Sequence, residues 1–167
     1  DIQDTQLKSG SLPDVAPSYW PMYSDNLTWP GAYIIFPGML YKQYGDRESI
    51  KTHYPSMKKW LGYMGKYVRD GIMTKDTYGD WCVPPLDIKS IHTSDPLRMT
   101  SSDFIGTAYY YTLLNLMQDY AVLLNKKDDA VIFKQTADRT FAAFNKNFFD
   151  TKSEQYGNNS QTSNVLA

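Results

Sequence analysis

Residues 78–81, Tyr-Gly-Asp-Trp, place two aromatic rings beside a carboxylate in a stretch that has no helical or strand period. An aromatic ring can stack on the C–H face of a sugar, and a carboxylate can accept hydrogen bonds from the sugar's hydroxyl groups. Gly79 permits a tight turn, and Pro84 and Pro85 stiffen the chain that follows. The stretch therefore has the chemistry of a sugar-binding loop.

A second aperiodic stretch, residues 1–28, carries the same mixture of side chains. Its aromatic and acidic residues, together with the tryptophan that follows it, are Asp14, Tyr19, Trp20, Tyr23, Asp25 and Trp29. Spacing alone leaves a scaffold role open as well, since Trp81 could cover the core under its loop and Asp80 could cap a short turn. From the two stretches together we predict that the substrate-binding residues are Asp14, Trp29, Tyr78, Asp80 and Trp81.

Few residues of the sequence could bind a metal ion or a cofactor. Cys82 is the sole cysteine, which excludes an internal disulfide and a cysteine zinc site. His53 and His92 are the two histidines, and they leave little for any other metal. No phosphate-binding loop, GxSxG or HExxH pattern occurs, so we expect neither a metal nor a cofactor. Cys82 has no histidine close to it in the sequence, and we expect it to be a small buried side chain.

The composition argues against two classes of partner. The formal net charge is −1 and the lysines are scattered, so a nucleic acid is not expected. No run of about 18 apolar residues occurs, so a membrane span is not expected either.

Aromatic residues make up 15% of the chain, with 14 Tyr and 4 Trp. Such amphipathic rings suit sugar clefts and protein interfaces, although helix packing can also use tyrosine.

Helical periodicity accounts for most of the remaining chain. The apolar spacing predicts helices over about 30–44, 47–69, 101–124 and 128–149, and a helix start at 160–167. Pro37 is expected to kink or shorten the first helix, and Gly71 to end the second. No strand is predicted. The expected buried stripes contain Ile50, Tyr54, Met57, Leu61, Met64 and Val68; Ile105, Ala108, Leu113, Met117, Tyr120 and Leu124; and Ala130, Phe133, Ala137, Phe141, Phe144 and Phe148.

This pattern predicts an all-α fold of antiparallel helix pairs. In such an array the short turns gather at one end. The long stretches 1–28 and 71–100 should then emerge together at the other end, and this rim is where we expect the site.

Several segments resemble, in the same order, bacterial α-L-rhamnosidases of the (α/α)6-barrel type, which are glycoside hydrolases of family 78. The similar segments are GSLPDVAP, Trp29 with PGAYIIFPGMLYKQYGDRESI, YGDW, AYYYTLLNLMQDYAVLLNKKDDAVIFKQTADRTFAAFNKNFFD and SQTSNVLA. They cover essentially the whole chain. The tryptophan followed by an apolar helix and YGD, with a later GDW, is the more specific set.

The resemblance implies a toroid of helix pairs and an inverting hydrolase that removes terminal L-rhamnose from plant glycosides or polysaccharides. It also implies that Trp29 and Trp81 line the sugar pocket, with Asp80 beside the second. The family usually has W-x-D-A where this chain has Trp29-Pro-Gly31-Ala, so one polar contact or cap is in doubt. Family members occur inside and outside the cytoplasm, so a cytoplasmic, periplasmic or secreted location stays open.

The resemblance places the catalytic acid and base outside residues 1–167. An inverting glycosidase needs two carboxyl groups about 6.5–9.5 Å apart. Glu48 and Glu154 are the only glutamates here, and both are more simply structural or solvated. We therefore expect residues 1–167 to form part of a catalytic barrel, roughly half of it, that is inactive without the rest of the parent polypeptide. No catalytic residue is assigned.

Two other functions stay open. A helical-repeat module could present its aromatic loops to a peptide or protein, although no repeat of the tetratricopeptide or HEAT kind is present. A different exo-acting glycosidase on the same toroid would carry similar loops.

Overall fold

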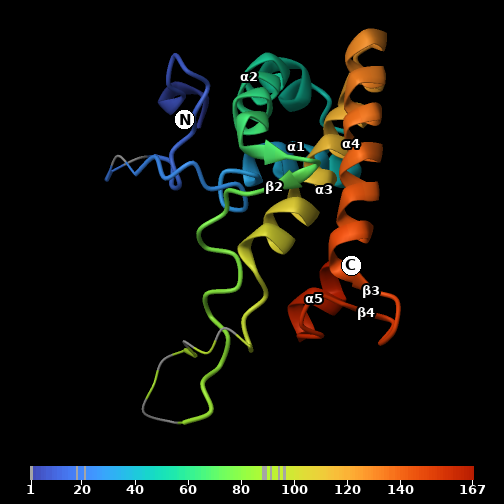
Figure 1. Cartoon of the computed structure of the whole chain (residues 1–167). Coiled ribbons are helices and arrows are strands. Elements are labelled where there is room, and N and C mark those ends of the chain that lie inside the picture. Colours follow the sequence, from blue (N-terminus) through green and yellow to red (C-terminus); the bar gives the residue numbers. More distant parts are fainter. Residues whose placement is uncertain are drawn as a thin grey trace.

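Two antiparallel helix pairs form the body of the chain in the computed structural model, which describes residues 2–17, 19–20, 22–87, 90, 92–93, 95 and 97–167. The first pair is α1 (Ala32–Tyr44) and α2 (Glu48–Met64), and the second is α3 (Ser102–Leu123) and α4 (Lys127–Phe148) (Figure 1). A short helix, α5 (Gln161–Leu166), follows, and 3-10 turns lie at Gln3–Thr5 and Gly65–Tyr67. The predicted all-α arrangement of helix pairs is confirmed.

Local sequence signals explain where the helices begin and end. The Ser101 side chain accepts a hydrogen bond from the Phe104 amide and caps α3, as the Thr-Ser-Ser run predicted. Gly45 ends α1 in the left-handed conformation, at φ 71°, and its N–H donates to the Tyr41 carbonyl. Pro37 lies inside α1, and the helix continues past it to Tyr44.

The second helix is shorter than predicted, because the chain leaves α2 at Met64 and turns into a hairpin. Strands β1 (Val68–Arg69) and β2 (Ile72–Met73) pair antiparallel, with Val68 opposite Met73. Asp70 and Gly71 form the two-residue connection at φ 50° and 85°. Asp-Gly is a favoured pair for such turns, so the prediction that Gly71 ends a helix was wrong. A second hairpin, β3 (Phe149–Asp150) with β4 (Gln155–Tyr156), was also not predicted.

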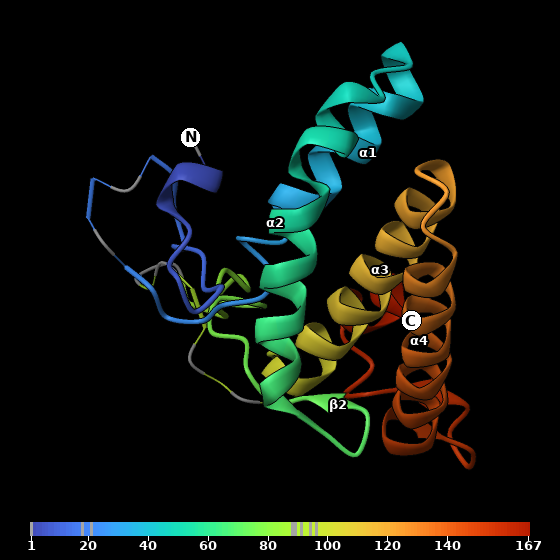
Figure 2. The same ribbon diagram turned by 90° about the horizontal axis from the view of Figure 1, so that it is seen from above.

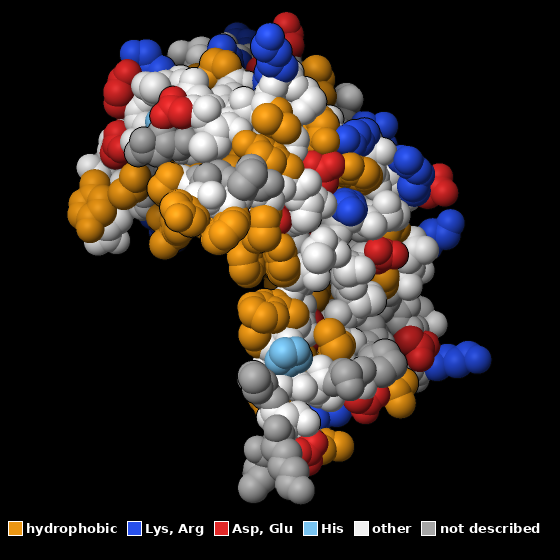
Figure 3. Space-filling model, turned by 90° about the vertical axis from the view of Figure 1, so that its left-hand side faces the viewer, with side chains coloured by type: hydrophobic (Ala, Val, Ile, Leu, Met, Phe, Trp, Pro, Cys, Tyr) orange, Lys and Arg blue, Asp and Glu red, His pale blue; other side chains and the backbone are white. Residues whose placement is uncertain are grey.

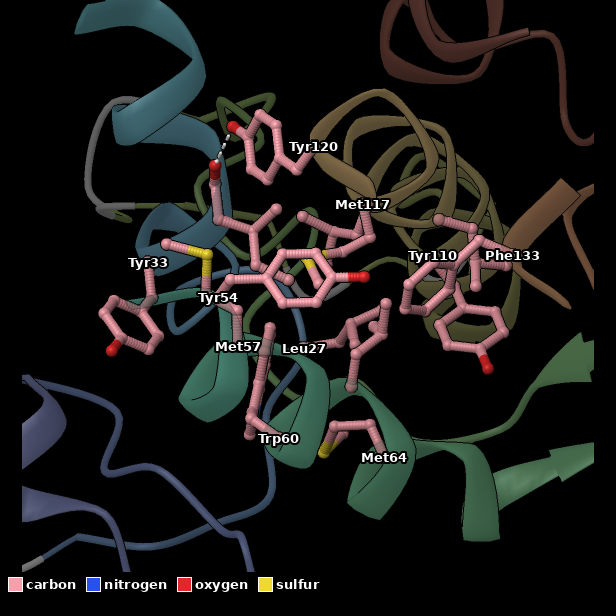
Figure 4. Close-up of a cluster of buried hydrophobic side chains, with 14 of the residues drawn as sticks. Leu27, Tyr33, Tyr54, Met57, Trp60, Met64, Tyr110, Met117, Tyr120 and Phe133 are labelled. Atoms are coloured by element: carbon pink, nitrogen blue, oxygen red, sulfur yellow. Dashed lines mark hydrogen bonds between the residues drawn. The ribbon is translucent and has the colours of Figure 1, made fainter. Parts of the chain in front are cut away.

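The core is built from methionine, tyrosine and tryptophan as much as from leucine and isoleucine (Figure 4). The stripe of α2 is buried as predicted from Ile50 to Met64, whereas Val68 is only half-buried in β1. In the predicted stripe of α4, Phe133, Ala137 and Phe144 are buried, and Ala130 and Phe148 are half-buried. The prediction was wrong for Phe141, which is 54% exposed. Tyr120 is buried, and its hydroxyl donates to the Ile34 carbonyl at 2.6 Å. Buried tyrosines thus join the helix pairs with both ring and hydroxyl, which explains part of the tyrosine surplus.

The short turns gather at one end of the helix pairs, as Figure 2 shows. Arg47, in the α1–α2 turn, donates from Nη2 to the Leu123 carbonyl at 2.5 Å. At the same end Asp129 of α4 accepts from the Tyr54 hydroxyl at 2.9 Å and pairs with Lys58 at 2.5 Å. The predicted arrangement of the turns is confirmed.

Asp25 fastens the N-terminal stretch to the far end of α2. Its carboxylate accepts hydrogen bonds from Ser11 Oγ at 2.8 Å, from the Tyr63 hydroxyl at 2.9 Å and from the Tyr67 hydroxyl. Lys66 Nζ lies 3.6 Å from the same carboxylate. Partial burial raises the pKa of Asp25, but the three hydroxyl donors and the Lys66 charge outweigh it, so the net pKa lies below the ordinary 3.8.

Because the folded-state pKa of Asp25 is lowered, its contribution to stability is present above the unfolded pKa and is lost as the pH falls through the folded one. We expect Asp25→Asn to lower the free energy of unfolding at pH 7 by about 2 kcal/mol. The difference from the wild type should shrink on acidification below 3.8. Urea unfolding at several pH values measures both effects.

The matched control for this measurement is Asp138→Asn. Asp138 pairs with Lys134 on the exposed surface of α4, so its loss should cost less than about 0.5 kcal/mol. An Asp25→Asn protein whose stability runs parallel to the wild type at every pH would show that Asp25 contributes nothing as a charged acceptor.

Candidate functional site

The two long stretches meet at a buried carboxylate, that of Asp76. Its Oδ1 accepts hydrogen bonds from the Asn26 side-chain amide at 3.1 Å, the Leu27 N–H at 3.3 Å and the Thr28 N–H at 3.1 Å. Its Oδ2 accepts from the Gly79 N–H at 3.0 Å. These contacts join residues 26–28 to residues 76–79, so the predicted meeting of the two stretches is confirmed.

Three of the predicted aromatic rings lie together beside this junction. The Trp29 and Tyr78 rings stack with centroids 4.3 Å apart and an interplanar angle of 24°. The Trp81 ring lies 6.4 Å from that of Trp29 at an angle of 60°, and the His92 ring packs edge-on against it at 6.2 Å. Trp29 is 39% and Trp81 46% exposed. Both indoles thus keep accessible surface on which a ligand can stack.

Asp14 binds the Tyr78 hydroxyl of this cluster with its carboxylate. Its side chain is buried, and its carboxylate accepts from Ser24 Oγ at 2.9 Å and from the Tyr78 hydroxyl at 3.2 Å. Burial raises the pKa of Tyr78, and the charge of Asp14 and its hydrogen bond raise it further. The Tyr78 hydroxyl therefore stays protonated and donates to Asp14, which fixes the ring on which Trp29 stacks.

Asp80 is bound by other parts of the chain. Its Oδ2 accepts from the Thr100 N–H at 2.7 Å, and its Oδ1 accepts from Thr162 Oγ1 of α5 at 3.0 Å. Thr100 also shares a hydroxyl hydrogen bond of 2.5 Å with Ser160, the N-cap of α5. Asp80 thus attaches its loop to α5. An ionised carboxylate oxygen has two lone pairs, so each oxygen retains one acceptor position.

Two hollows border the loop of residues 77–81. One, of about 390 Å³, is lined by Trp29, Thr28 and Gly79 together with residues of α3 and α5. The other, of about 340 Å³, is lined by residues 77–81 and 99–102. Both fall within the size range of small-ligand sites. Trp29 lines the first hollow and Trp81 the second, and the two hollows share Gly79. Figure 3 shows hydrophobic side chains along the inner edge of a concave outline.

The other aromatic and acidic candidates of the N-terminal stretch lie elsewhere. Tyr19 and Trp20 form an exposed edge-to-face pair with centroids 5.4 Å apart. The Tyr23 hydroxyl donates to the Thr5 carbonyl at 2.7 Å, and Asp25 holds the end of α2 as described above. None of these four side chains lines either hollow.

Two residues that follow Trp81 and Trp29 closely in the sequence also bear on the predictions. Cys82 is exposed, so the prediction of a buried side chain was wrong. It follows the exposed Trp81 in a turn that belongs to neither core cluster. A Cβ at Gly31 would lie 2.9 Å from the Leu27 carbonyl oxygen, so the turn before α1 leaves no room for the acidic side chain that the resemblance leads us to expect there.

Among the described residues no group of His, Cys, Asp and Glu could hold a metal ion. Within the same residues, no helix is long and apolar enough to cross a membrane.

Sequence reasoning missed Asn26, Asp76 and Thr162. Asn26 is fully buried, and its Oδ1 accepts from the Trp29 N–H at 2.9 Å, which fixes the approach of that indole. An Asp or Asn side chain that accepts from the N–H three residues on has the spacing of a helix N-cap, and both Asn26-x-x-Trp29 and Asp76-x-x-Gly79 have it. Thr162 gave no such signal, because its contact with Asp80 spans 82 residues.

Comparisons with known proteins show the family to which the chain belongs. Residues 1–167 match the model of the bacterial alpha-L-rhamnosidase six-hairpin glycosidase domain. The chain is 31% identical over 144 residues to an alpha-L-rhamnosidase of Streptomyces avermitilis, with 86% of this chain and 13% of that protein aligned.

Solved structures of alpha-L-rhamnosidases are similar as well. The enzyme from Dictyoglumus thermophilum matches with a TM-score of 0.87 and 34% identity, over 99% of this chain and 18% of that one. The Streptomyces avermitilis enzyme complexed with L-rhamnose matches with a TM-score of 0.84 and 28% identity, over 99% of this chain and 15% of that one. This chain therefore spans less than a fifth of the relatives it matches, and it belongs to the family of the bacterial alpha-L-rhamnosidase six-hairpin glycosidase domain.

Proposed function

We propose that this chain forms one wall of the sugar pocket of an alpha-L-rhamnosidase, which hydrolyses terminal α-L-rhamnosyl residues of glycosides or polysaccharides. The observation that carries the proposal is the accessible cluster of Trp29, Tyr78 and Trp81 beside two ligand-sized hollows. A similar structure holds L-rhamnose, which supports the same class of ligand here.

The chemistry of the cluster suits this sugar. L-rhamnose carries a methyl group and C–H faces that stack favourably on an indole. Its hydroxyl groups need partners, and the side chains beside the rings that can supply them are Thr28 and Thr162 in the first hollow and the remaining acceptor positions of Asp80 in the second. The rings would supply the apolar contact, and these groups would orient the sugar.

We propose that the rest of the parent polypeptide supplies the general acid and base of an inverting mechanism. Glu48 opens α2 on the surface and pairs with Lys51 at 3.3 Å. Glu154 is exposed in the β3–β4 connection. Neither residue borders the two hollows, and the aspartates beside the cluster are held by protein donors.

Exposed apolar side chains support a place within a larger barrel. The C-terminal part of α1 exposes Phe36, Met39, Leu40, Tyr41 and Tyr44. A patch of this kind on one helix is typical of an interface. We propose that neighbouring helices of the parent toroid cover it, in keeping with a domain named for six hairpins, of which residues 1–167 would provide a part.

The isolated chain should not hydrolyse 4-nitrophenyl α-L-rhamnoside, because both catalytic carboxyl groups are proposed to lie outside it. Release of 4-nitrophenol measured by absorbance tests this, with a complete alpha-L-rhamnosidase as the positive control. Turnover that copurifies with the 167-residue chain would contradict the assignment of acid and base to other segments.

The isolated chain should bind L-rhamnose, and the Trp81→Ala variant should lose most of that binding. Stacked indoles contribute about 1 kcal/mol each beyond burial, so we expect a loss of roughly fivefold or more in affinity. Titration of intrinsic tryptophan fluorescence measures it. Trp20→Ala is the matched control, because Trp20 lies outside both hollows, and its affinity should match the wild type.

The same titration separates the alternatives. A preference for another monosaccharide over L-rhamnose would indicate a different exo-acting glycosidase. Indifference to every monosaccharide, together with specific capture of a protein, would favour an interaction module and contradict the proposed pocket.

A further inference from the structure

We propose that Asp76 is a positioning residue, which sets the spacing and tilt of the Trp29 and Trp81 rings for the sugar. This inference rests on the proposed function for its ligand. Its structural part, the control of the ring geometry by one carboxylate, stands on the hydrogen bonds and packing around Asp76.

The carboxylate of Asp76 is buried and accepts hydrogen bonds from both stretches of the chain. It is 8% exposed, and its four hydrogen-bond donors are uncharged N–H groups, three from residues 26–28 and one from Gly79. A buried carboxylate is costly unless such donors satisfy it. Neither stretch can move away from the other without leaving part of this charge without a donor.

Each side of this junction leads directly to one of the rings. On the first side, Asn26 donates to Asp76 and accepts from the Trp29 N–H at 2.9 Å. On the second side, Gly79 separates Tyr78 from Asp80, and the Trp81 N–H donates to the Tyr78 carbonyl at 3.2 Å. The carboxylate is thus the common reference point for both indoles.

Helix α3 holds the carboxylate in place from behind. A Cβ at Gly106 would lie 3.2 Å from the Asp76 Cβ, and a Cβ at Gly79 would lie 2.9 Å from Ile105 Cδ1 and 3.0 Å from Asp76 Oδ2. Both glycines therefore allow the loop to lie directly on the buried face of α3. A site attached to a rigid helix keeps its geometry better than one on a free loop.

Asparagine at position 76 keeps the size of the side chain but has one acceptor oxygen. Either the three donors of residues 26–28 or the Gly79 N–H must then face an amide NH2 group. The two stretches lose their common acceptor, and the Trp29–Trp81 geometry should relax.

The test compares Asp76→Asn with the wild type after labelling with 5-fluorotryptophan. Fluorine NMR resolves the labelled indoles, and single Trp→Phe variants assign them. We expect the resonances of Trp29 and Trp81 to shift or broaden in Asp76→Asn, while that of Trp60, which is buried in the core, stays in place.

Asp129→Asn is the matched control. Asp129 is likewise a hydrogen-bonded aspartate, but its partners are the Tyr54 hydroxyl and the Lys58 ammonium group. It lies at the end of the helix pairs that holds the short turns. Its substitution should lower stability and leave the Trp29 and Trp81 resonances unchanged. Unchanged Trp29 and Trp81 resonances in a folded Asp76→Asn protein would overturn the proposal.

A second variant covers the case in which Asp76→Asn does not fold. Gly79→Ala forces a Cβ against Ile105 and the Asp76 carboxylate, and it should shift the same two resonances. If Trp29 and Trp81 are unaffected in this variant, the junction does not set the rings, and the proposal fails.

Titration of the same samples with L-rhamnose tests the link to the ligand. We expect about tenfold weaker binding for Asp76→Asn and unchanged binding for Asp129→Asn. Shifted resonances with undiminished affinity would overturn the link between Asp76 and the sugar. A wild type that does not bind L-rhamnose would instead contradict the proposed function, while the fluorine comparison would still decide the role of Asp76.

Discussion

The hydrogen bonds accepted by the buried Asp76 carboxylate are the interaction on which the candidate site depends. They join residues 26–28 to residues 76–79, two segments about 50 residues apart that belong to no helix or strand. The cost of burying the charge is offset only while both stretches supply their N–H groups. The conformation of each stretch is therefore conditional on the other, and both depend on α3, against which Gly79 and Asp76 pack.

Acidic and aromatic side chains differ in their surroundings at this rim. Asp14, Asp25, Asp76 and Asp80 each accept hydrogen bonds from other parts of the chain, so they mainly hold the loops in place. Trp29 and Trp81 retain accessible ring surface. In the proposed site the carboxylates would mainly position the loops and the indoles would provide most of the contact with the ligand. This differs from the simple picture of a ring and an acid contacting one sugar side by side.

Much of the fold followed from the sequence, because it rests on local signals. The spacing from Ile50 to Met64 and the Thr-Ser-Ser run before α3 act within one or two helical turns. The hairpin at Asp70-Gly71 also has a local signal, the Asp-Gly pair. Because the apolar Val68 extends the helical spacing of α2, a longer helix was predicted there instead. The site was only partly predictable. Trp29 and Trp81 could be named from their loops, whereas the contacts of Asp76 with Asn26 and of Asp80 with Thr162 span 50 and 82 residues, which no periodicity reveals.

We propose above all that the rim formed by the two stretches binds L-rhamnose. A crystal structure of the protein soaked with L-rhamnose tests this most directly. We predict sugar density in van der Waals contact with the ring of Trp29 or Trp81. Ordered L-rhamnose elsewhere on the molecule, with both indoles left uncovered, would contradict it.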